Sequence, residues 1–273
     1  MLLTVAEIEE GCRQVATLFP WIPSLILWRG WEHAAYRRFQ LIEPVLDIGC
    51  GDRRFFRLMF PACRDVVGVE LDPGVAQAAL ASGVYRTVHR IPADQLPTSA
   101  ERFGSAFANC SLEHMDHLSK VLGGVHASLR PGAPFLCSVV TDRFRQWSPL
   151  PLVLAAAGAP ELGRQVQLGH ERYHHLANPL SPASWRTAFE EAGFRVEQEL
   201  PIVPELTGRL FLFIDQFVHL PRGAGEWHEP LTEYLQRFPA FHDGFVRVLS
   251  DLLAVETNWE DGLGVVFWLR SGR

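Results

Sequence analysis

Short apolar runs alternate with helical patterns through the middle of the chain, and this alternation predicts the fold. Five runs have the length and bounding residues of strands. They are 45–48, 66–69, 85–89, 105–109 and 135–140. The segment after the second run opens with Asp72-Pro73, a capping residue followed by the residue that suits the first helical position. We therefore expect a parallel sheet with helices on both faces, which is the α/β class.

The second half of the chain extends this core. A helix over 183–192 is expected to start after Ser181-Pro182 and to end at Gly193. A strand over 194–200 follows, and its expected partner is 264–269. The segment between them is too long for a hairpin, and its apolar positions have helical spacing. These positions lie in 210–220, 231–238 and 241–255, and the first run is interrupted by Asp215, Gln216 and His219.

The insertion between these two strands allows two interpretations. Its helices either pack on the core and on each other, or they present an apolar surface to a lipid-linked acceptor or a membrane. The polar residues of the insertion are not strongly basic, which disfavours contact with a membrane surface. Residues 141–182 are expected to form a loop beyond the carboxyl ends of the strands, where open α/β sheets bind ligands.

The segment before the first strand is helical and rich in aromatic residues. A helix is expected over 4–18, and a second one is expected to contain Tyr36, Phe39 and Ile42. The aromatic stretch 21–33 between them either covers one edge of the sheet or forms a lid over a ligand. We therefore divide the chain into an N-terminal cap, a core and an insertion within the same domain. Their bounds are 1–42, then 43–200 with 263–273, and 201–262.

Composition narrows the kinds of partner and the cellular compartment that we expect for this chain. The formal charge of −6 and the pI near 6.0 argue against a nucleic-acid partner, because no net basic field attracts phosphates. The five cysteines are scattered without paired spacing, which favours free thiols in a reducing compartment. The first residues lack a basic and then apolar leader, and no apolar run reaches the ~20 residues needed to span a bilayer. We therefore expect a cytoplasmic protein.

The segment Asp47-Ile48-Gly49-Cys50-Gly51 carries the strongest functional signal. Glycine lets a chain leave a strand and pass close to a ligand, because no Cβ blocks the approach. A dinucleotide fingerprint would place a third glycine at 54, where this chain has Arg54. Asp47 repels phosphate but suits a ligand with ammonium and sulfonium charges. Glu70 follows Gly49 by 21 residues at the end of the second strand, where an acid can accept both hydroxyls of a ribose.

These residues resemble the class I S-adenosylmethionine-dependent methyltransferases, of the type 11 kind. The family's cofactor loop is D-x-G-x-G-x-G, which Asp47, Gly49 and Gly51 match, whereas Arg53 occupies the position of the last glycine. The resemblance implies a Rossmann-like, seven-stranded, mostly parallel sheet that ends in an antiparallel pair. It also implies S-adenosyl-L-methionine as the cofactor. The residues it places at the cofactor are Asp47, Gly49, Cys50, Gly51, Glu70 and Leu71.

The resemblance extends over about residues 43–200. Family members carry an acid ahead of a Leu-Pro pair, where it binds the adenine amino group. Here the pair is Leu96-Pro97, Pro92 occupies the usual acidic position, and Asp94 is the carboxylate nearest to it. The segment 109–114 resembles the end of the family's fourth strand, which implies that Asn109 lies along the cofactor and that Glu113 faces the acceptor.

Methyl transfer needs an aligned acceptor, and a hydroxyl acceptor gains from a general base. Histidine suits that role at neutral pH. The candidates are His114, His170, His174 and His175. Arg172 is a candidate for binding an acceptor carboxylate or phosphate through its planar guanidinium. No cysteine pair accompanies the histidines, and we expect them to serve the acceptor loop or the structure, so we predict no metal site.

The sequence thus predicts a methyltransferase that acts in line on a small-molecule, lipid-linked or sugar-linked acceptor at oxygen. The alternative is a non-catalytic S-adenosylmethionine-binding regulator or scaffold with the same fold. An NAD-dependent oxidoreductase is disfavoured by Arg54 and Asp47. The sequence determines neither the acceptor's identity nor the oligomeric state.

Overall fold

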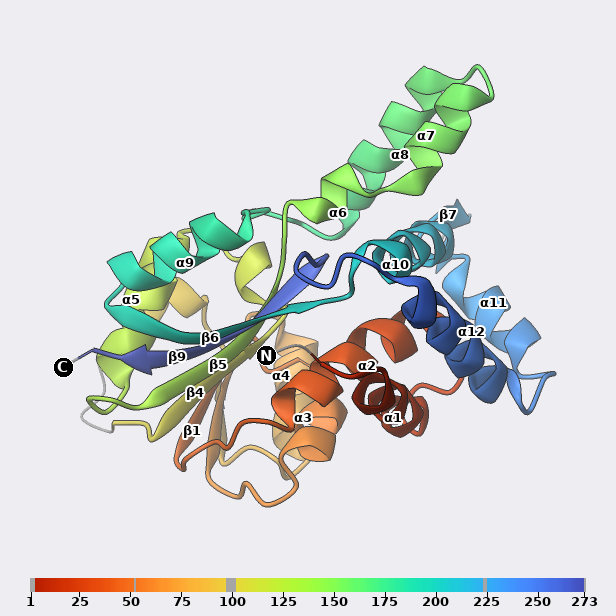
Figure 1. The fold of residues 1–273 in the computed structure, drawn as a ribbon. Helices are drawn as coiled ribbons and strands as arrows, with labels where there is room; N and C mark the ends of the chain where they lie inside the picture. The colour runs from red at the N-terminus through yellow and green to blue at the C-terminus, as the bar shows by residue number, and fades with distance from the viewer. Residues whose placement is uncertain (1–2, 52, 97–101, 223–224, 273) are drawn as a thin grey trace. The chain divides into compact units, whose positions relative to one another are not determined.

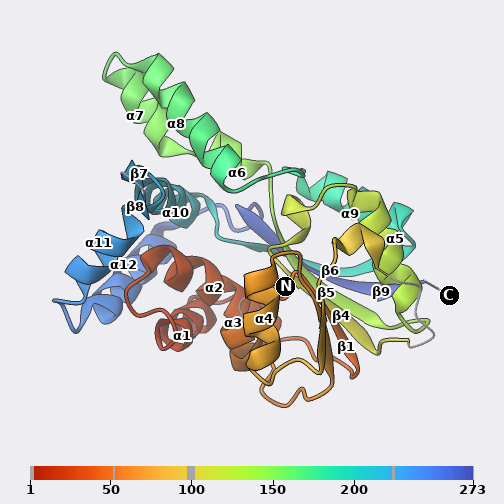
Figure 2. The same cartoon turned by 180° about the vertical axis from the view of Figure 1, so that it is seen from behind.

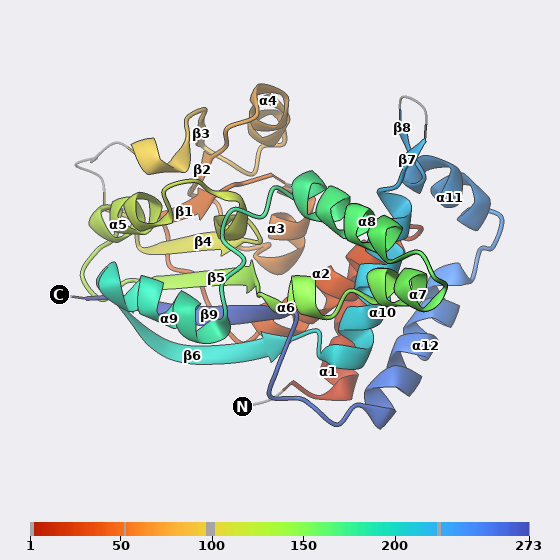
Figure 3. The same ribbon diagram turned by 90° about the horizontal axis from the view of Figure 1, so that it is seen from above.

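Seven strands form one sheet in the order β3-β2-β1-β4-β5-β9-β6. Strands β1, β2, β3, β4 and β5 pair in parallel, with Val45 of β1 opposite Val66 of β2 and Ser105 of β4. Figure 3 shows β9 running opposite to its neighbours β5 and β6. The strands are β1 (Val45–Ile48), β2 (Val66–Val69), β3 (Thr87–His89), β4 (Ser105–Asn109), β5 (Pro134–Val140), β6 (Phe194–Ile202) and β9 (Gly264–Ser271).

The computed structural model describes residues 3–51, 53–96, 102–222 and 225–272. The chain forms two compact units. The α/β unit contains the sheet and consists of Tyr36–Thr141, Ala177–Leu200 and Val265–Arg273. The helical unit consists of Met1–Ala35, Asp142–Leu176 and Pro201–Gly264. No helix of the described residues combines the length and the apolar composition that crossing a bilayer requires.

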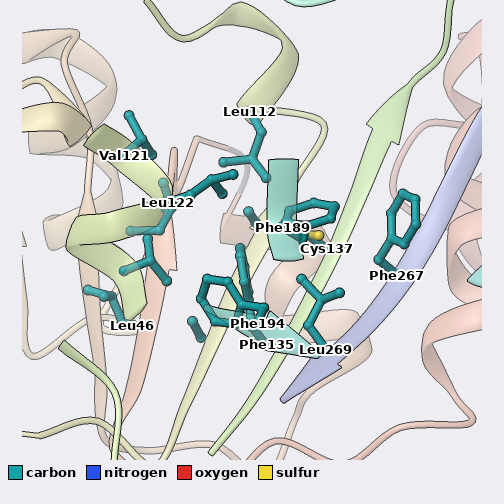
Figure 4. Close-up of a cluster of buried hydrophobic side chains, with 14 of the residues drawn as sticks. Leu46, Leu112, Val121, Leu122, Phe135, Cys137, Phe189, Phe194, Phe267 and Leu269 are labelled. Atoms are coloured by element: carbon teal, nitrogen blue, oxygen red, sulfur yellow. The ribbon is translucent and has the colours of Figure 1, made fainter. Parts of the chain in front are cut away.

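One face of the sheet is covered by α5 (Leu118–Ser128) and α9 (Pro182–Glu191). Figure 4 shows side chains from both helices and from β1, β5 and β9 packed in one buried cluster. Leu46 and Phe135 come from the strands, Leu122 from α5 and Phe189 from α9, and each of them is almost fully buried. This continuous burial explains why the parallel strands are apolar runs rather than alternating ones.

The opposite face carries α3 (Arg53–Met59), and α4 (Pro73–Ala81) lies beside it (Figure 2). Phe107 points to this face because its neighbours in β4 point to the other one. Its ring contacts those of Tyr36, Phe56 and Phe60 at centroid distances of 5.3 to 5.6 Å. An aromatic cluster therefore anchors the helix that follows the glycine loop.

The helical unit is built from eight helices within the described residues (Figure 1). They are α1 (Val5–Ala16), α2 (Pro23–Tyr36), α6 (Arg143–Gln146), α7 (Pro149–Ala156), α8 (Pro160–Tyr173), α10 (Glu205–Val218), α11 (His228–Leu235) and α12 (Phe241–Val255), with a hairpin of β7 (Pro221–Arg222) and β8 (Gly225–Glu226). Helices α1 and α2 cross closely, since a Cβ on Gly11 would lie 2.1 Å from the carbonyl oxygen of Gly30.

Most of the predicted elements are confirmed. Strands β1, β2 and β4 have the predicted bounds, Asp72 and Ser181 cap α4 and α9, and β9 lies between β5 and β6. The segment 201–262 is helical as expected. Trp28 and Trp31 of the aromatic stretch are buried inside the helical unit, 5.0 Å from Phe211 and 6.0 Å from Trp259 between ring centroids.

Two expectations about the elements were wrong, and prolines explain the second of them. The second N-terminal helix starts at Pro23 and ends at Tyr36, so it does not extend to Ile42. The expected loop over 141–182 contains α6, α7 and α8, and Pro149 and Pro160 stand in the first turn of their helices. Proline is tolerated there because the first amides of a helix have no partner within the helix.

Candidate functional site

The loop after β1 turns sharply over the end of β2. The amides of Gly49 and Cys50 both donate to the carbonyl of Val69, at 2.8 and 3.1 Å. Gly49 has φ +70°, and a Cβ on it would lie 2.6 Å from the Cβ of Ser111. The Ser111 hydroxyl donates to the carbonyl of Ile48 at 2.7 Å. Glycine is therefore required at position 49 both by the backbone conformation and by the loop after β4.

Gly51 differs from Gly49 because, within the part of the chain that the structure describes, no atom beyond its chain neighbours crowds it. A Cβ on Gly51 would lie 3.9 Å from Glu70 Oε2 and from the carbonyl oxygen of Gly49. This distance is ordinary van der Waals contact, so packing within the protein does not require glycine here. The missing side chain leaves room beside the Glu70 carboxylate. The residues therefore fit a ligand that passes close to the loop and carries groups for a carboxylate to bind.

Asp47 lies under this loop and is only 2% exposed. The Tyr85 hydroxyl donates to Asp47 Oδ2 at 2.7 Å and lies 3.1 Å from the carbonyl oxygen of Cys50. Burial raises the pKa of Asp47 to about 7; the Tyr85 hydrogen bond lowers this pKa, and the Glu70 carboxylate raises it. Burial also raises the pKa of the Cys50 thiol, which is therefore not a reactive thiolate.

The turn after β2 holds two more of the predicted cofactor residues, Glu70 and Leu71. Glu70 Oε1 accepts a hydrogen bond from the amide of Asp72 at 3.0 Å, and Asp72 in turn caps α4 through the amide of Val75. Leu71 is 66% exposed. Asp94 lies in the short helix η1 (Ala93–Gln95), and Pro97 of the Leu-Pro pair lies outside the described residues. The assignments of Leu71 and Asp94 to the cofactor stay predictions.

The end of β4 is tightly connected to β5. Asn109 is the last residue of β4 and pairs with Ser138, and Cys110 has φ +44°, a left-handed conformation that is uncommon for a residue other than glycine. Glu113 is fully buried, and its Oε1 accepts from the amide of Val140 at 3.3 Å. Its contacts fix the strand end, and its role at an acceptor stays a prediction.

His114 ends the 3-10 helix η2 (Leu112–His114), and its Nε2 lies 4.0 Å from Glu113 Oε1. The next helix, α5, begins only at Leu118, after the left-handed residue His117. The His114 side chain is 35% exposed, so it is accessible to solvent beside the end of β4. Its role as a base stays a prediction.

The remaining predicted residues belong to the helical unit. His170 and His174 lie one turn apart on α8, and their Nε2 atoms are 2.8 and 2.7 Å from the same Oδ2 of Asp215 on α10. His175 is exposed with φ +45°, and Arg172 donates to the carbonyl of Leu168 in its own helix. The predicted roles of His174, His175 and Arg172 toward an acceptor stay predictions.

Sequence reasoning missed three residues that shape these sites. Tyr85 and Ser111 hold the glycine loop, but each contacts it from a distant position and has no local motif. Asp215 had a visible signal, since it interrupts an apolar helical run. Its spacing of four residues to His219 matches the spacing of His170 to His174, which is the spacing that places two side chains on one helix face.

The sequence matches a family model described as a methyltransferase domain over residues 9–199. A ubiquinone biosynthesis O-methyltransferase of Bordetella avium is 27% identical over 165 residues, which cover 58% of this chain and 66% of that protein. An uncharacterized methyltransferase of Schizosaccharomyces pombe is 29% identical over 168 residues, which cover 57% of this chain and 60% of that protein. The chain thus spans less than two thirds of the length of these curated relatives.

Two solved structures share the fold. A possible histamine N-methyltransferase of Thermotoga maritima, described as S-adenosylmethionine-dependent, aligns with a TM-score of 0.56 at 17% identity. The alignment covers 96% of this chain and 97% of that one. The cyclopropane synthase MmaA2 of Mycobacterium tuberculosis aligns with a TM-score of 0.53 at 17% identity, over 88% of this chain and 83% of that one. At these identities the likeness shows the fold alone.

Proposed function

Because the chain belongs to the family of class I S-adenosylmethionine-dependent methyltransferases, we propose that it methylates an oxygen atom of a small-molecule or lipid-linked acceptor. The name of the Bordetella relative supports transfer to oxygen and an acceptor from quinone biosynthesis. The family assignment supports S-adenosylmethionine as the methyl donor, and it favours an enzyme over the scaffold alternative.

The observation that carries this proposal is the open side of Gly51. A Cβ on Gly51 would lie at van der Waals distance from Glu70, so glycine itself leaves that space open, and Asp47 adds a second carboxylate below it. Two carboxylates at one loop suit a ligand with positive charge and hydroxyl donors, and they oppose phosphates. A sulfonium nucleoside has both features, whereas a pyrophosphate has neither.

The residues of the chain divide the work of binding. When bound, S-adenosylmethionine supplies an electrophilic methyl group on a positively charged sulfur. Glu70 is placed to accept the ribose hydroxyls, and Gly51 leaves room for the nucleoside. Asp47, when ionised, favours the cationic end of the ligand through its charge. The family resemblance places the acceptor next to the segment 109–114, where His114 is the proposed base for a hydroxyl proton.

The experiment has a binding stage and a transfer stage. Isothermal titration with S-adenosylmethionine and S-adenosylhomocysteine measures binding to the wild type and to Gly51→Val, whose side chain occupies the open space. We expect binding by the wild type and at least tenfold weaker binding by the variant, about 1.4 kcal/mol. Equal binding by both proteins would contradict the proposed site.

The transfer stage uses cofactor labelled on its methyl group with a panel of phenols, catechols and isoprenoid quinols. We expect label on an oxygen atom of at least one hydroxylated compound, and label on carbon would contradict the proposed chemistry. Binding of the cofactor without transfer to any panel member would support the scaffold alternative.

The five cysteines are free, which supports a reducing compartment such as the cytoplasm.

A further inference from the structure

Two helices of the helical unit bring four polar side chains to one buried place. Helix α8 contributes His170 and, at its C-cap, His174. Helix α10 contributes Asp215 and, at its C-cap, His219, and the members of each pair are four residues apart. The side chains of His170 and Asp215 are 4% and 6% exposed, and that of His174 is 22% exposed. Residues of these types are metal ligands when their donor atoms converge.

The donor atoms do converge. His170 Nε2 and His174 Nε2 lie 2.8 and 2.7 Å from Asp215 Oδ2, and the two nitrogens are 3.1 Å apart. In a tetrahedral zinc site with bonds of about 2.0–2.1 Å, neighbouring ligand atoms are roughly 3.3 Å apart. The three atoms therefore need to separate by only a few tenths of an ångström to surround one ion. They form the one group of described residues whose ligand atoms gather in this way.

Hydrogen bonding alone does not account for all three contacts. A neutral imidazole nitrogen is either a donor or an acceptor, and a carboxylate oxygen only accepts. If His170 and His174 both donate to Asp215, their own contact at 3.1 Å joins two donors. If one of them accepts from the other, its contact with Asp215 joins two acceptors. A cation among the three atoms satisfies them together.

The charge of the site favours a cation as well. Among the described residues, the ion-pair partners of Asp215 are histidines alone, namely His170, His174 and His219. A buried carboxylate needs a compensating positive charge, which either a protonated histidine or a bound cation can supply. A divalent ion would supply that charge without protonation of the imidazoles.

A second layer of contacts holds the ligands in place. His219 Nε2 lies 3.6 Å from Asp215 Oδ1, and its Nδ1 lies 2.8 Å from Glu226 Oε2. The ring of Phe144 stacks on His170 at 4.9 Å, and Tyr173 stacks on His219 at 4.0 Å, between centroids. Carboxylate and histidine partners outside the ligand set are typical of metal sites, because they fix ring orientation.

We propose that His170, His174 and Asp215 bind one divalent transition-metal ion of the zinc class and that this ion joins α8 to α10. Three protein ligands leave a fourth position, which solvent can reach past the partly exposed His174. Residues 170–174 read H-E-x-x-H, a spacing that places two histidines on one helix face toward zinc, and the expectation of no metal site overlooked this motif. The structure supplies a third ligand from a different helix, 45 residues from His170.

The test is metal binding by the full chain without an affinity tag, after removal of metals with a chelator. We expect one equivalent of Zn²⁺ per chain in competition with a chromogenic chelator, and the visible absorption of a tetrahedral site with Co²⁺. Asp215→Asn and His174→Ala are expected to bind about 100-fold more weakly, a loss of two factors of ten. His175→Ala is the matched control, since it removes the adjacent exposed histidine and should bind like the wild type.

Binding of S-adenosylhomocysteine by the same samples reports whether each variant is folded, and it separates this site from the proposed function. A wild-type chain that binds Zn²⁺ and Co²⁺ no better than its Asp215→Asn variant would overturn the proposal. Equal loss in His175→Ala and His174→Ala would also overturn it. If Asp215→Asn does not fold, His174→Ala and the cobalt spectrum of the wild type decide the outcome.

Discussion

The phenolic hydroxyl of Tyr85 donates a hydrogen bond to Asp47 Oδ2 at 2.7 Å, across a separation of 38 residues. The bond joins the segment before β3 to Asp47 within β1, directly under the glycine loop. It favours the ionised form of a carboxylate that is otherwise surrounded by protein. Tyr85 therefore tunes the charge below the proposed cofactor site.

The first prediction concerns Tyr85→Phe. Loss of the hydroxyl removes a contact that lowers the pKa of Asp47, so this pKa should rise above its value of about 7. Asp47 would then be less ionised at neutral pH, and a cationic ligand would bind more weakly. Binding of S-adenosylmethionine is measured between pH 6 and pH 9. The affinity of Tyr85→Phe should rise at a higher pH than the affinity of the wild type. The control is Tyr234→Phe, which alters an exposed tyrosine of α11, and identical profiles for the two variants would contradict this role.

The second prediction concerns the stability of the ligand-free protein. The pKa of Asp47 is about 7 in the folded state against 3.8 as its ordinary value, so between these values the folded state binds the extra proton. Stability from this group is therefore fully present below about pH 4 and falls as the pH rises to about 7, by an amount on the order of 4 kcal/mol. The Asp47→Asn variant should not show this decrease in the free energy of unfolding. Urea unfolding at pH 5 and pH 8 measures the part of this fall above pH 5, on the order of 3 kcal/mol, and an equal pH dependence in both proteins would refute the shift.

The third prediction compares the two glycines of the loop. Gly49→Ala should destabilise the protein, because the left-handed conformation alone costs about 1–2 kcal/mol and the new Cβ would clash with Ser111. Gly51→Ala should leave the free energy of unfolding almost unchanged, since its Cβ has room. It should still weaken binding of S-adenosylhomocysteine. Denaturant unfolding and calorimetric titration measure the two effects, and the reverse pattern would show that Gly51 is the structural glycine.

The fourth prediction concerns Glu70→Gln. The amide keeps the shape of the side chain but loses the charge that suits two hydroxyl donors. S-adenosylhomocysteine should bind at least tenfold more weakly, about 1.4 kcal/mol. The same substitution at Glu190, an exposed residue of α9, is the control and should have no effect. Adenine, which lacks the ribose, should distinguish the two proteins little; a large difference with adenine would place Glu70 at the base instead.

The sequence was most informative where the structure depends on neighbours in the chain. The run 45–48 and the glycines after it predicted both the strand and the sharp turn, because burial and backbone conformation are local properties there. The caps of α4 and α9 were predicted for the same reason. The prolines of α7 and α8 misled, because proline marks either a loop or the first turn of a helix.

Contacts between distant segments were beyond sequence reasoning. Tyr85 has no pattern that connects it to Asp47, and Ser111 has none that connects it to Gly49. His170 and His174 were noticed as a pair, but only tertiary packing determines that the helix with Asp215 lies against them. The environment that sets the pKa of Asp47 arises in the same way.

The central claim is that the loop from Asp47 to Gly51 binds the nucleoside of S-adenosylmethionine beside Glu70. A crystal structure of the wild-type chain grown with S-adenosylhomocysteine tests it most directly. We expect that the nucleoside lies against Gly51 and that both ribose hydroxyls are at hydrogen-bond distance from the Glu70 carboxylate. A nucleoside bound at any other place, or the Arg53 side chain filling the space beside Gly51, would contradict it.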